Sequence, residues 1–147
     1  MTTVSRAGPK DRADWCLLRD ALWPLAAGTN AADIAAQLDK PDLAAFIARD
    51  PAGRPQGFAE AAIRHDYVNG CKTSPVGFLE GIYVVPEARR QGVASQLIAA
   101  VEAWVRERGC TELASDASID NTASHSLHEA LGFAETQRVV FFRRLLD

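Results

Sequence analysis

Two spacings of apolar residues divide the chain into predicted helices and strands. The clearest pattern runs from about Gly92 to Arg108, where Val93, Leu97 and Val101 recur at helical spacing. Shorter apolar runs bounded by Gly, Pro, Asn and Asp are typical of strands. In chain order, we predict a strand over 3–7, helices over 11–23 and 30–38, strands over 43–48, 57–67 and 76–85, a helix over 92–108, a strand over 113–116, a helix over 121–131 and a strand over 139–146. This order predicts one α/β (α+β) domain over 1–147, with a mixed sheet and helices on its faces.

Residues with suitable capping chemistry mark several boundaries. Asn30 is predicted to cap the second helix, and Gly109 and Gly132 follow the last periodic positions of two later helices. Pro86 is predicted to end the strand over 76–85, because proline has no N–H to donate to a sheet.

The composition narrows the class of protein. The 147 residues suit one ordinary domain, with 48% hydrophobic and 24% charged residues and a formal net charge of -3. That charge argues against a broad nucleic-acid-binding face and is compatible with a small cationic substrate. The longest uncharged stretch, over 21–32, is shorter than the roughly 20 apolar residues needed to cross a membrane. No secretory signal is recognisable, so the expected compartment is the cytoplasm.

The three cysteines suggest no metal or redox motif. Cys16, Cys71 and Cys110 are far apart in the sequence and form no C-x-x-C pair. We therefore expect reduced, structural thiols and no metal site.

The most informative stretch joins the strand over 76–85 to the long helix. Arg89, Arg90 and Gly92 lie just before the helix start. Such a start exposes unpaired backbone N–H groups and the positive end of the helix dipole, so it can bind a pyrophosphate that a glycine allows to approach closely. Residues 89–94 match the Arg/Gln-x-x-Gly-x-Gly/Ala signature for coenzyme A, and the chain resembles the GNAT superfamily of N-acetyltransferases. Taken alone, the same residues also fit a solvated basic turn before an ordinary helix.

A second segment strengthens the resemblance. Asn121 opens the predicted helix over 121–131 and Gly132-Phe133 follows it, which is similar to the second GNAT signature. Many members place a tyrosine four residues before that glycine, where it can protonate the leaving thiolate, but this chain has His128 there. Imidazole titrates near neutral pH and can act as an acid, although a helical histidine also fits a packing or surface role. The resemblance implies a GNAT fold with a mixed, mostly antiparallel sheet, and acetyl-coenzyme A as cosubstrate.

Longer matching segments point to one family within the superfamily. The chain resembles the chromosomal-type aminoglycoside 6'-N-acetyltransferases in Leu22-Trp23-Pro24, Arg64-His65-Asp66-Tyr67-Val68-Asn69-Gly70-Cys71, Ser74-Pro75-Val76, Phe78-Leu79-Glu80-Gly81-Ile82 and Ala114-Ser115-Asp116. The resemblance implies acetylation of the 6'-amino group of aminoglycosides, antibiotic resistance, and a homodimer. The substrate-binding positions that it implies are Trp23, Tyr67, Glu80, Asp116 and Gln137. The implied coenzyme A contacts are Ile82, Tyr83, Val84, Arg89, Arg90, Gln91, Gly92, Val93, Ala94, Ser95, Asn121 and His128.

The chemistry of the implied substrate agrees with the residue types. An aminoglycoside is a polyhydroxylated polycation, so its pocket needs carboxylates for ammonium groups and aromatic rings against sugar faces. Glu80 lies inside an otherwise apolar strand run, which a simple surface charge explains poorly. Asp116 also fits a plain turn residue, and Trp23 and Tyr67 also fit core aromatics.

Two positions depart from the family pattern. Family members carry a histidine near Ala26 and an acidic residue at the position of Gln137. This chain is therefore expected to lack one contact at each edge of the pocket, with consequences for its substrate range and affinity.

The implied mechanism is direct transfer without a covalent enzyme intermediate. Glu80 is the first candidate to take the proton of the amine, and Asp116 is the second candidate or an ammonium anchor. Backbone N–H groups near 82–84 are implied to polarise the thioester oxygen. Two alternatives remain open: a GNAT enzyme for a polyamine, another small amine or a protein N-terminus, and a coenzyme A-binding regulatory module without turnover.

Overall fold

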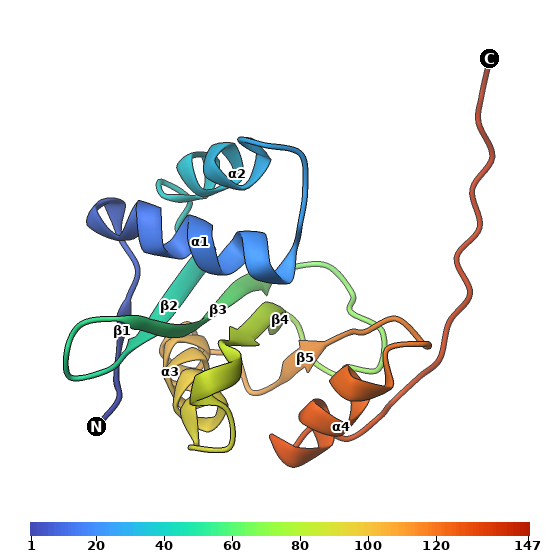
Figure 1. Ribbon diagram of the computed structural model, residues 1–147. Helices are drawn as coiled ribbons and strands as arrows, with labels where there is room; N and C mark the ends of the chain where they lie inside the picture. The colour runs from blue at the N-terminus through green and yellow to red at the C-terminus, as the bar shows by residue number, and fades with distance from the viewer. The chain divides into compact units, whose positions relative to one another are not determined.

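The computed structural model describes all residues from Met1 to Asp147, and Figure 1 shows the arrangement of its elements. The strands are β1 (Thr3–Arg6), β2 (Leu43–Arg49), β3 (Pro55–Arg64), β4 (Val76–Val84) and β5 (Leu113–Ser115). The α-helices are α1 (Arg12–Leu22), α2 (Thr29–Gln37), α3 (Val93–Glu107) and α4 (Thr122–Ala130), and short 3-10 turns η1 (Pro9–Asp11) and η2 (Pro86–Ala88) precede α1 and follow β4. Up to the end of α4, each predicted element is confirmed, with boundaries that differ by a few residues.

The chain forms two compact units. The first, Met1–Asp116, contains the whole sheet and the helices α1 to α3, and the second, Ala117–Asp147, contains α4 and the C-terminal segment. No helix in either unit has the length and apolar character needed to span a membrane.

The sheet of the first unit is mixed and mostly antiparallel. Its strand order is β1-β2-β3-β4-β5, with antiparallel pairing up to β4 and a parallel pairing of β4 with β5. The parallel pairing is short, because it covers only Gly77 to Leu79 of β4. The predicted fold class is therefore confirmed.

The helices α1 and α2 cover one face of the sheet (Figure 1). Alternate residues of β2 and β3 point to this face, where Ile47 and Phe58 pack against Trp15 and Leu18 of α1 and Ile34 of α2. Each of these side chains is almost fully buried. This apolar layer fixes α1 over β3, close to the centre of the sheet.

The helix α3 packs against the sheet through small residues. A Cβ atom on Gly77 would lie 2.5 Å from Cγ2 of Val105, and one on Gly57 would lie 3.4 Å from Cδ1 of Leu97. The apolar stripe predicted for this helix is buried as expected, with Val93, Leu97 and Val101 at 2% exposure or less. Glycine on the strands thus lets a helix with large side chains approach the sheet closely.

The predicted cap of the second helix was wrong. The residue before α2 is Gly28, with a positive φ of 85°, and Asn30 lies inside the first turn. Its side chain instead donates to the carbonyl oxygen of Trp23 at 2.9 Å and to Asp20 at 2.7 Å. Asn30 therefore fastens α2 to the end of α1, a tertiary contact that local capping rules do not include.

The predicted final strand over 139–146 was also wrong. No helix or strand follows α4, and the apolar side chains of the C-terminal segment are exposed, up to 93% for Phe142. A strand requires backbone partners along its length, and within this chain the segment has none from a neighbouring strand. The run Val139 to Phe142 is apolar on both faces, so its composition is typical of a strand even though no strand forms.

The close packing between Gly77 and Val105 predicts that a side chain at position 77 destabilises the fold. Gly77→Ala should lower the free energy of unfolding by about 1–3 kcal/mol, because the new methyl group would collide with the branched, stiff Val105 side chain. Denaturant unfolding measures the change. Gly8→Ala is the matched control: a Cβ atom on Gly8 would meet nothing within 4 Å, so the change should stay within about 0.5 kcal/mol. Equal stability of the two variants would contradict the close contact between Gly77 and Val105.

Candidate functional site

The strand β4 has a β-bulge at Glu80. Across from β3, Gly81 pairs with Glu60 and Leu79 pairs with Ala61, so Glu80 has no partner residue on β3. A bulge bends the strand and redirects the side chains around it. The burial pattern changes at the same point: β4 is buried from Val76 to Leu79 and exposed or half-buried from Glu80 onward.

Beyond the bulge, β4 loses its neighbour on one side. The parallel pairing with β5 ends at Leu79, so residues 80–84 have β3 on one side and no strand on the other. Backbone N–H and C=O groups along such an edge are available to a ligand. The predicted contacts Ile82, Tyr83 and Val84 lie on this open edge.

Two carboxylates, Glu80 and Asp116, come directly after the residues at which the β4–β5 pairing stops. Ser115 is in register with Leu79, and its hydroxyl donates to the Leu79 carbonyl oxygen at 3.3 Å. In a parallel pair both strands advance in the same direction, so Asp116 follows Ser115 as Glu80 follows Leu79. Glu80 and Asp116, the two residues predicted to act as acid–base groups, thus directly follow the last paired residues of the two strands.

Glu80 has an arginine partner that the sequence reading missed. Nη2 of Arg64 lies 2.8 Å from Oε1 of Glu80, and its guanidinium carbon lies 3.5 Å from the ring centroid of Phe78. Both side chains of the ion pair are partly exposed. The register explains the contact, because Arg64 ends β3 opposite the start of β4 and lies on the same face as Phe78 and Glu80. Glu80 is thus an exposed carboxylate with a structural ion-pair partner, and its functional role stays a prediction.

The indole of Trp23 lies beside the bulge. A Cβ atom on Gly81 would collide with Cζ2 of Trp23, so the ring occupies the space over this glycine. The ring also meets Phe58 in an edge-to-face arrangement with centroids 6.0 Å apart. Trp23 is therefore a packing residue next to the segment that carries Glu80, and its contact with a substrate stays a prediction.

Tyr67 lies in the loop between β3 and β4 and is 68% exposed, so it is not a core aromatic. The loop is nevertheless anchored. Val68 packs with Val76 and Phe78, and the Glu112 carboxylate accepts the backbone N–H groups of residues 72 and 73. These contacts, led by the hydroxyl of residue 73, hold the pKa of Glu112 below its usual range. The loop that carries Tyr67 is thus attached to the start of β5.

The turn before α3 has the features of an anion-binding site. Gly92 and Arg90 have positive φ angles of 79° and 63°, and nothing would lie within 4 Å of a Cβ atom on Gly92. The first bond within the helix runs from Gln96 to the carbonyl oxygen of Gly92 at 3.1 Å. The N–H groups of Val93, Ala94 and Ser95 therefore lie outside the helical ladder and are available for a ligand such as a phosphate.

The two arginines of this turn differ. Arg89 donates from Nε to the carbonyl oxygen of Val84 at 2.9 Å, and its guanidinium lies 5.7 Å from the ring centroid of Tyr83. It therefore holds the turn against the end of β4. Arg90 is exposed, so its charge is accessible at the surface beside Gly92, and Gln91 donates to the carbonyl oxygen of Glu87 at 3.2 Å.

Three predicted site residues belong to the second unit. Asn121 caps α4 by accepting the N–H of Ser124 at 3.1 Å. Nδ1 of His128 lies 2.7 Å from the Ser124 carbonyl oxygen, and its ring meets Phe133 edge-to-face with centroids 5.2 Å apart. Gln137 is exposed in the C-terminal segment. The roles of these three residues stay predictions.

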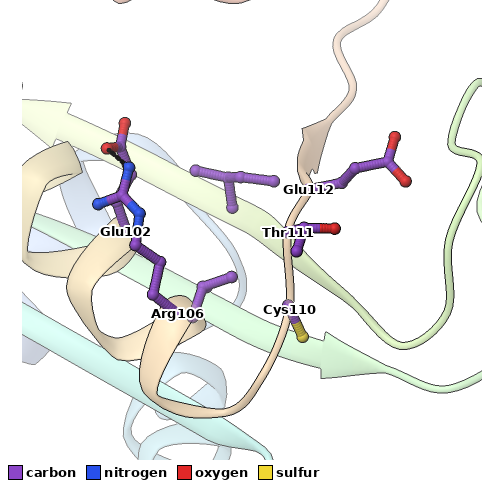
Figure 2. Close-up of a pocket in the computed structure, with 7 residues that line it drawn as sticks. Glu102, Arg106, Cys110, Thr111 and Glu112 are labelled. Atoms are coloured by element: carbon purple, nitrogen blue, oxygen red, sulfur yellow. Dashed lines mark hydrogen bonds and ion pairs between the residues drawn. The ribbon is translucent and has the colours of Figure 1, made fainter.

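A shallow surface pocket lies elsewhere in the first unit (Figure 2). It is formed at the C-terminal end of α3 and the start of β5, and it is lined by Glu102, Val105, Arg106, Cys110, Thr111, Glu112 and Leu113. Its volume of about 210 Å³ is below the roughly 300–1,000 Å³ of typical ligand pockets. None of the predicted site residues lines it. No group of three or more His, Cys, Asp or Glu side chains in the structure is arranged to hold a metal ion.

The chain matches known acetyltransferases over most of its length. The model of the acetyltransferase (GNAT) family matches residues 13–133. An aminoglycoside N(6')-acetyltransferase type 1 from Serratia marcescens is 53% identical over 133 residues, which are 90% of this chain and 91% of the relative. The enzyme of the same name from Stenotrophomonas maltophilia is 47% identical over 99% of this chain and 94% of its own length.

Solved structures give the same result. The aminoglycoside antibiotic 6'-N-acetyltransferase AAC(6')-Ih from Acinetobacter baumannii superposes with a TM-score of 0.97 at 39% identity, over 100% of both chains. AAC(6')-Iy in complex with the bisubstrate analog CoA-S-monomethyl-acetylneamine has a TM-score of 0.94 at 48% identity and covers 99% of both chains.

The three cysteines form no disulfide with one another. Burial raises the pKa of the Cys71 and Cys110 thiols, and at Cys71 the Glu112 carboxylate raises it further. Burial and the neighbouring Asp20 also raise the pKa of Cys16. A raised pKa keeps a thiol protonated at neutral pH, whereas a nucleophile requires the thiolate. The thiols are therefore poor candidates for a covalent acetyl-enzyme.

The thiol environments predict slow alkylation of the folded chain. At pH 7 iodoacetamide should label Cys110, which is 4% exposed, about tenfold or more slowly than in the same chain unfolded in guanidinium. Mass spectrometry of tryptic peptides measures each site separately, and the unfolded sample is the control. Labelling of folded Cys71 or Cys110 as fast as in the unfolded chain would show an activated thiol and reopen the covalent route.

Proposed function

We propose that this chain, which belongs to the acetyltransferase (GNAT) family, transfers the acetyl group of acetyl-coenzyme A to the 6'-amino group of aminoglycoside antibiotics. The observation that carries the proposal is the end of the β4–β5 pairing, where Glu80 and Asp116 each follow the last paired residue of their strand and Trp23 lies over Gly81. The similarity to 6'-acetyltransferases over nearly the whole chain supports the choice of substrate. Acetylation turns an ammonium group into a neutral amide, and on this proposal it confers resistance to the drug.

The turn before α3 fits the pyrophosphate of coenzyme A. The positive φ of Gly92, the open space beside it and the first-turn N–H groups of 93–95 suit a closely bound anion, and Arg90 adds a positive charge. Bound acetyl-coenzyme A supplies an acetyl thioester, whose carbonyl carbon forms the new C–N bond as the C–S bond breaks. The open edge of β4 at 82–84 offers backbone N–H groups that can polarise the carbonyl oxygen. Asn121 and His128 are proposed as further cofactor contacts by resemblance.

The proposed substrate site combines negative charge with aromatic rings. Glu80 and Asp116 would bind ammonium groups, and Trp23 and Tyr67 would contact sugar faces. Gln137 is proposed by resemblance and carries no charge. The site is thus suited to a polycationic sugar.

Glu80 is the proposed proton acceptor for the amine, directly or through water. The Arg64 guanidinium bound to Glu80 orients this carboxylate at the bulge. Asp116 is the second candidate, and otherwise it anchors an ammonium group. Holding amine and thioester in a productive orientation supplies a large part of the rate without a covalent intermediate.

We further propose a cytoplasmic homodimer. The exposed apolar residues of the C-terminal segment support the dimer, because exposed apolar side chains grouped in this way commonly mark interfaces. The patch consists of Val139, Val140, Phe141, Phe142, Leu145 and Leu146. Sedimentation analysis of the intact chain tests it, and a monomer at all concentrations would contradict it.

The substrate is tested by acetylation of kanamycin or tobramycin, followed by mass analysis to identify the modified amine. Thiol release measures turnover. Acetylation at the 6'-amino group supports the proposal, whereas turnover with spermidine or a peptide N-terminus and none with either drug would indicate another GNAT substrate. Binding of acetyl-coenzyme A without thiol release from any amine would indicate a regulatory module.

Glu80→Gln should lower turnover of an aminoglycoside by about 100- to 10,000-fold at neutral pH, since the change keeps the shape and removes the base. Steady-state kinetics with both substrates measure it, and the affinity for acetyl-coenzyme A should stay nearly unchanged. The matched control is Glu107→Gln at the exposed end of α3. Raising the pH should partly restore the Glu80→Gln variant, because more of the amine is then neutral. Full activity with an unchanged pH profile would remove Glu80 from the mechanism.

Gly92→Asp should lower the affinity for acetyl-coenzyme A by about tenfold or more relative to Gly92→Asn. Asp and Asn both tolerate a positive φ, so the pair differs mainly by one negative charge at the proposed pyrophosphate site. Isothermal titration calorimetry measures the affinity, and thermal unfolding confirms that both variants are folded. Equal affinities of the two folded variants would exclude the turn before α3 as the pyrophosphate site.

A further inference from the structure

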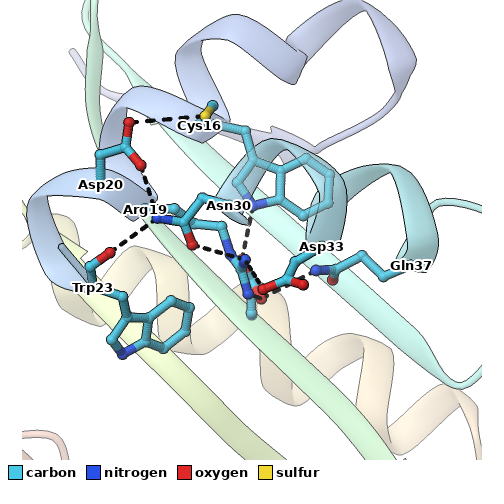
Figure 3. A network of polar contacts seen from close by, with 9 residues as sticks. Cys16, Arg19, Asp20, Trp23, Asn30, Asp33 and Gln37 are labelled. Carbon is cyan, nitrogen blue, oxygen red and sulfur yellow. Dashed lines mark hydrogen bonds and ion pairs between the residues drawn. The ribbon is translucent and has the colours of Figure 1, made fainter. Parts of the chain in front are cut away.

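A group of polar side chains is buried under α1, next to the candidate site (Figure 3). Arg19 is 8% exposed, Glu60 is 4% exposed and Asn30 is 2% exposed. Buried charges are costly unless they are paired and hydrogen-bonded. In this structure no buried side-chain nitrogen or oxygen lacks a hydrogen-bond partner. The group is therefore a completed network.

On the side of the sheet, the Arg19 guanidinium is bound by the Glu60 carboxylate of β3. Arg19 binds Glu60 with two nitrogens, Nε at 2.6 Å and Nη2 at 3.2 Å. The indole N–H of Trp15 donates to the same carboxylate at 2.8 Å. A two-point contact of this kind fixes the plane of the guanidinium as well as its position.

The other side of the Arg19 guanidinium faces Trp23. Its carbon lies 4.8 Å from the centroid of the Trp23 ring, a cation–π contact. Asn30 links the same two residues: it accepts from Nη1 of Arg19 at 3.0 Å and donates to the Trp23 carbonyl oxygen at 2.9 Å. The Trp23 N–H closes the end of α1 on the carbonyl oxygen of Arg19 at 2.6 Å. Both the backbone and the ring of Trp23 are thus attached to Arg19.

The far end of this network is the bulge. Glu60 is directly opposite Gly81 in the register, and the Trp23 ring fills the space over Gly81. The contacts therefore run from β3 through Arg19 to Trp23 and reach β4 next to Glu80. An apolar residue in place of Arg19 could fill the volume but could not bind both the carboxylate and the ring face.

We propose that Arg19 is a positioning residue of the substrate site, which holds the Trp23 indole at one angle beside Glu80 so that the ring can receive the sugar face of an aminoglycoside. The role of the ring in substrate binding rests on the proposed function. Arg19 itself is buried behind the ring and acts through it.

Arg19→Lys tests the proposal, because lysine keeps the charge for Glu60 but loses the planar, two-point geometry. The KM for an aminoglycoside should rise about tenfold, while the KM for acetyl-coenzyme A should stay within about twofold, as for a loss confined to one substrate. Trp15→Phe and Asp33→Asn are matched controls. Trp15→Phe removes the hydrogen bond to Glu60, and Asp33→Asn removes the negative charge that faces Arg19. Both leave the Arg19 guanidinium on Trp23, so neither should raise the aminoglycoside KM appreciably.

A double-mutant cycle separates positioning from stability. In a Trp23→Leu background, Arg19→Lys should raise the aminoglycoside KM no further, since its effect passes through the ring. A merely structural role would give additive effects. Additive effects, or an unchanged KM in folded Arg19→Lys, would overturn the proposal. If Arg19→Lys does not fold, the double variant Arg19→Gln/Glu60→Gln, which leaves no unpaired buried charge, takes its place. The aminoglycoside KM should rise as much in this variant, and an unchanged KM would again overturn the proposal.

A measurement independent of substrate distinguishes failure of this proposal from failure of the proposed function. The chain has three tryptophans, so ¹⁵N-indole spectra contain three side-chain signals. In Arg19→Lys the Trp23 signal should shift or broaden while that of Trp104 stays in place. An unchanged Trp23 signal overturns the positioning role. If the Trp23 signal changes but the protein acetylates no aminoglycoside, then Arg19 positions the ring and the proposed substrate is wrong.

Discussion

The candidate site depends on the short parallel pairing between β4 and β5. Hydrogen bonding joins the two strands only from Gly77 to Leu79, and the bulge at Glu80 then turns β4 away from a fully paired position. A sheet whose strands stayed paired would bury its backbone groups in the ladder and leave none for a ligand. Because the pairing ends there, one strand carries a buried half that belongs to the core and an exposed half that belongs to the site.

The open half of β4 has no neighbouring strand on one side, so other elements must support it. β3 supports it along one edge, and α1 supports it from one face through Trp23, which fills the space over Gly81. The ion pair of Arg19 with Glu60 lies under this ring and attaches it to the centre of the sheet. A buried ion pair is weak evidence for stability, since an apolar replacement is often as stable, but it does define orientation. On the proposal made for Arg19, this polar network behind the ring sets the orientation of Trp23 beside Glu80.

The sequence predicted those features that depend on neighbours in the chain. The apolar stripe of α3, the turn at Gly92 and the strand β4 with Glu80 all follow from local periodicity and composition. Features that depend on tertiary partners were missed or wrong. Asn30 fits a helix cap, but its bond partner is the carbonyl oxygen of Trp23. Arg64 reaches Glu80 only because of the register between β3 and β4, which includes a bulge that no local pattern reveals. The segment over 139–146 has the composition of a strand and lacks a partner in its own chain.

The proposed reaction joins a polycation to a polyanion, and the distribution of charge along β4 suits this task. Glu80 lies at the bulge and Asp116 directly follows β5, whereas Arg90 and the start of α3 follow the other end of the exposed half of β4. A strand rises roughly 3.3 Å per residue, so Glu80 and Val84 are separated by about 13 Å. That exceeds the Debye length of about 8 Å at physiological ionic strength. The charges at the two ends are therefore largely screened from each other, although Arg64 offsets part of the charge of Glu80. On the proposed function, the amine and the thioester would meet at the uncharged segment between the two ends.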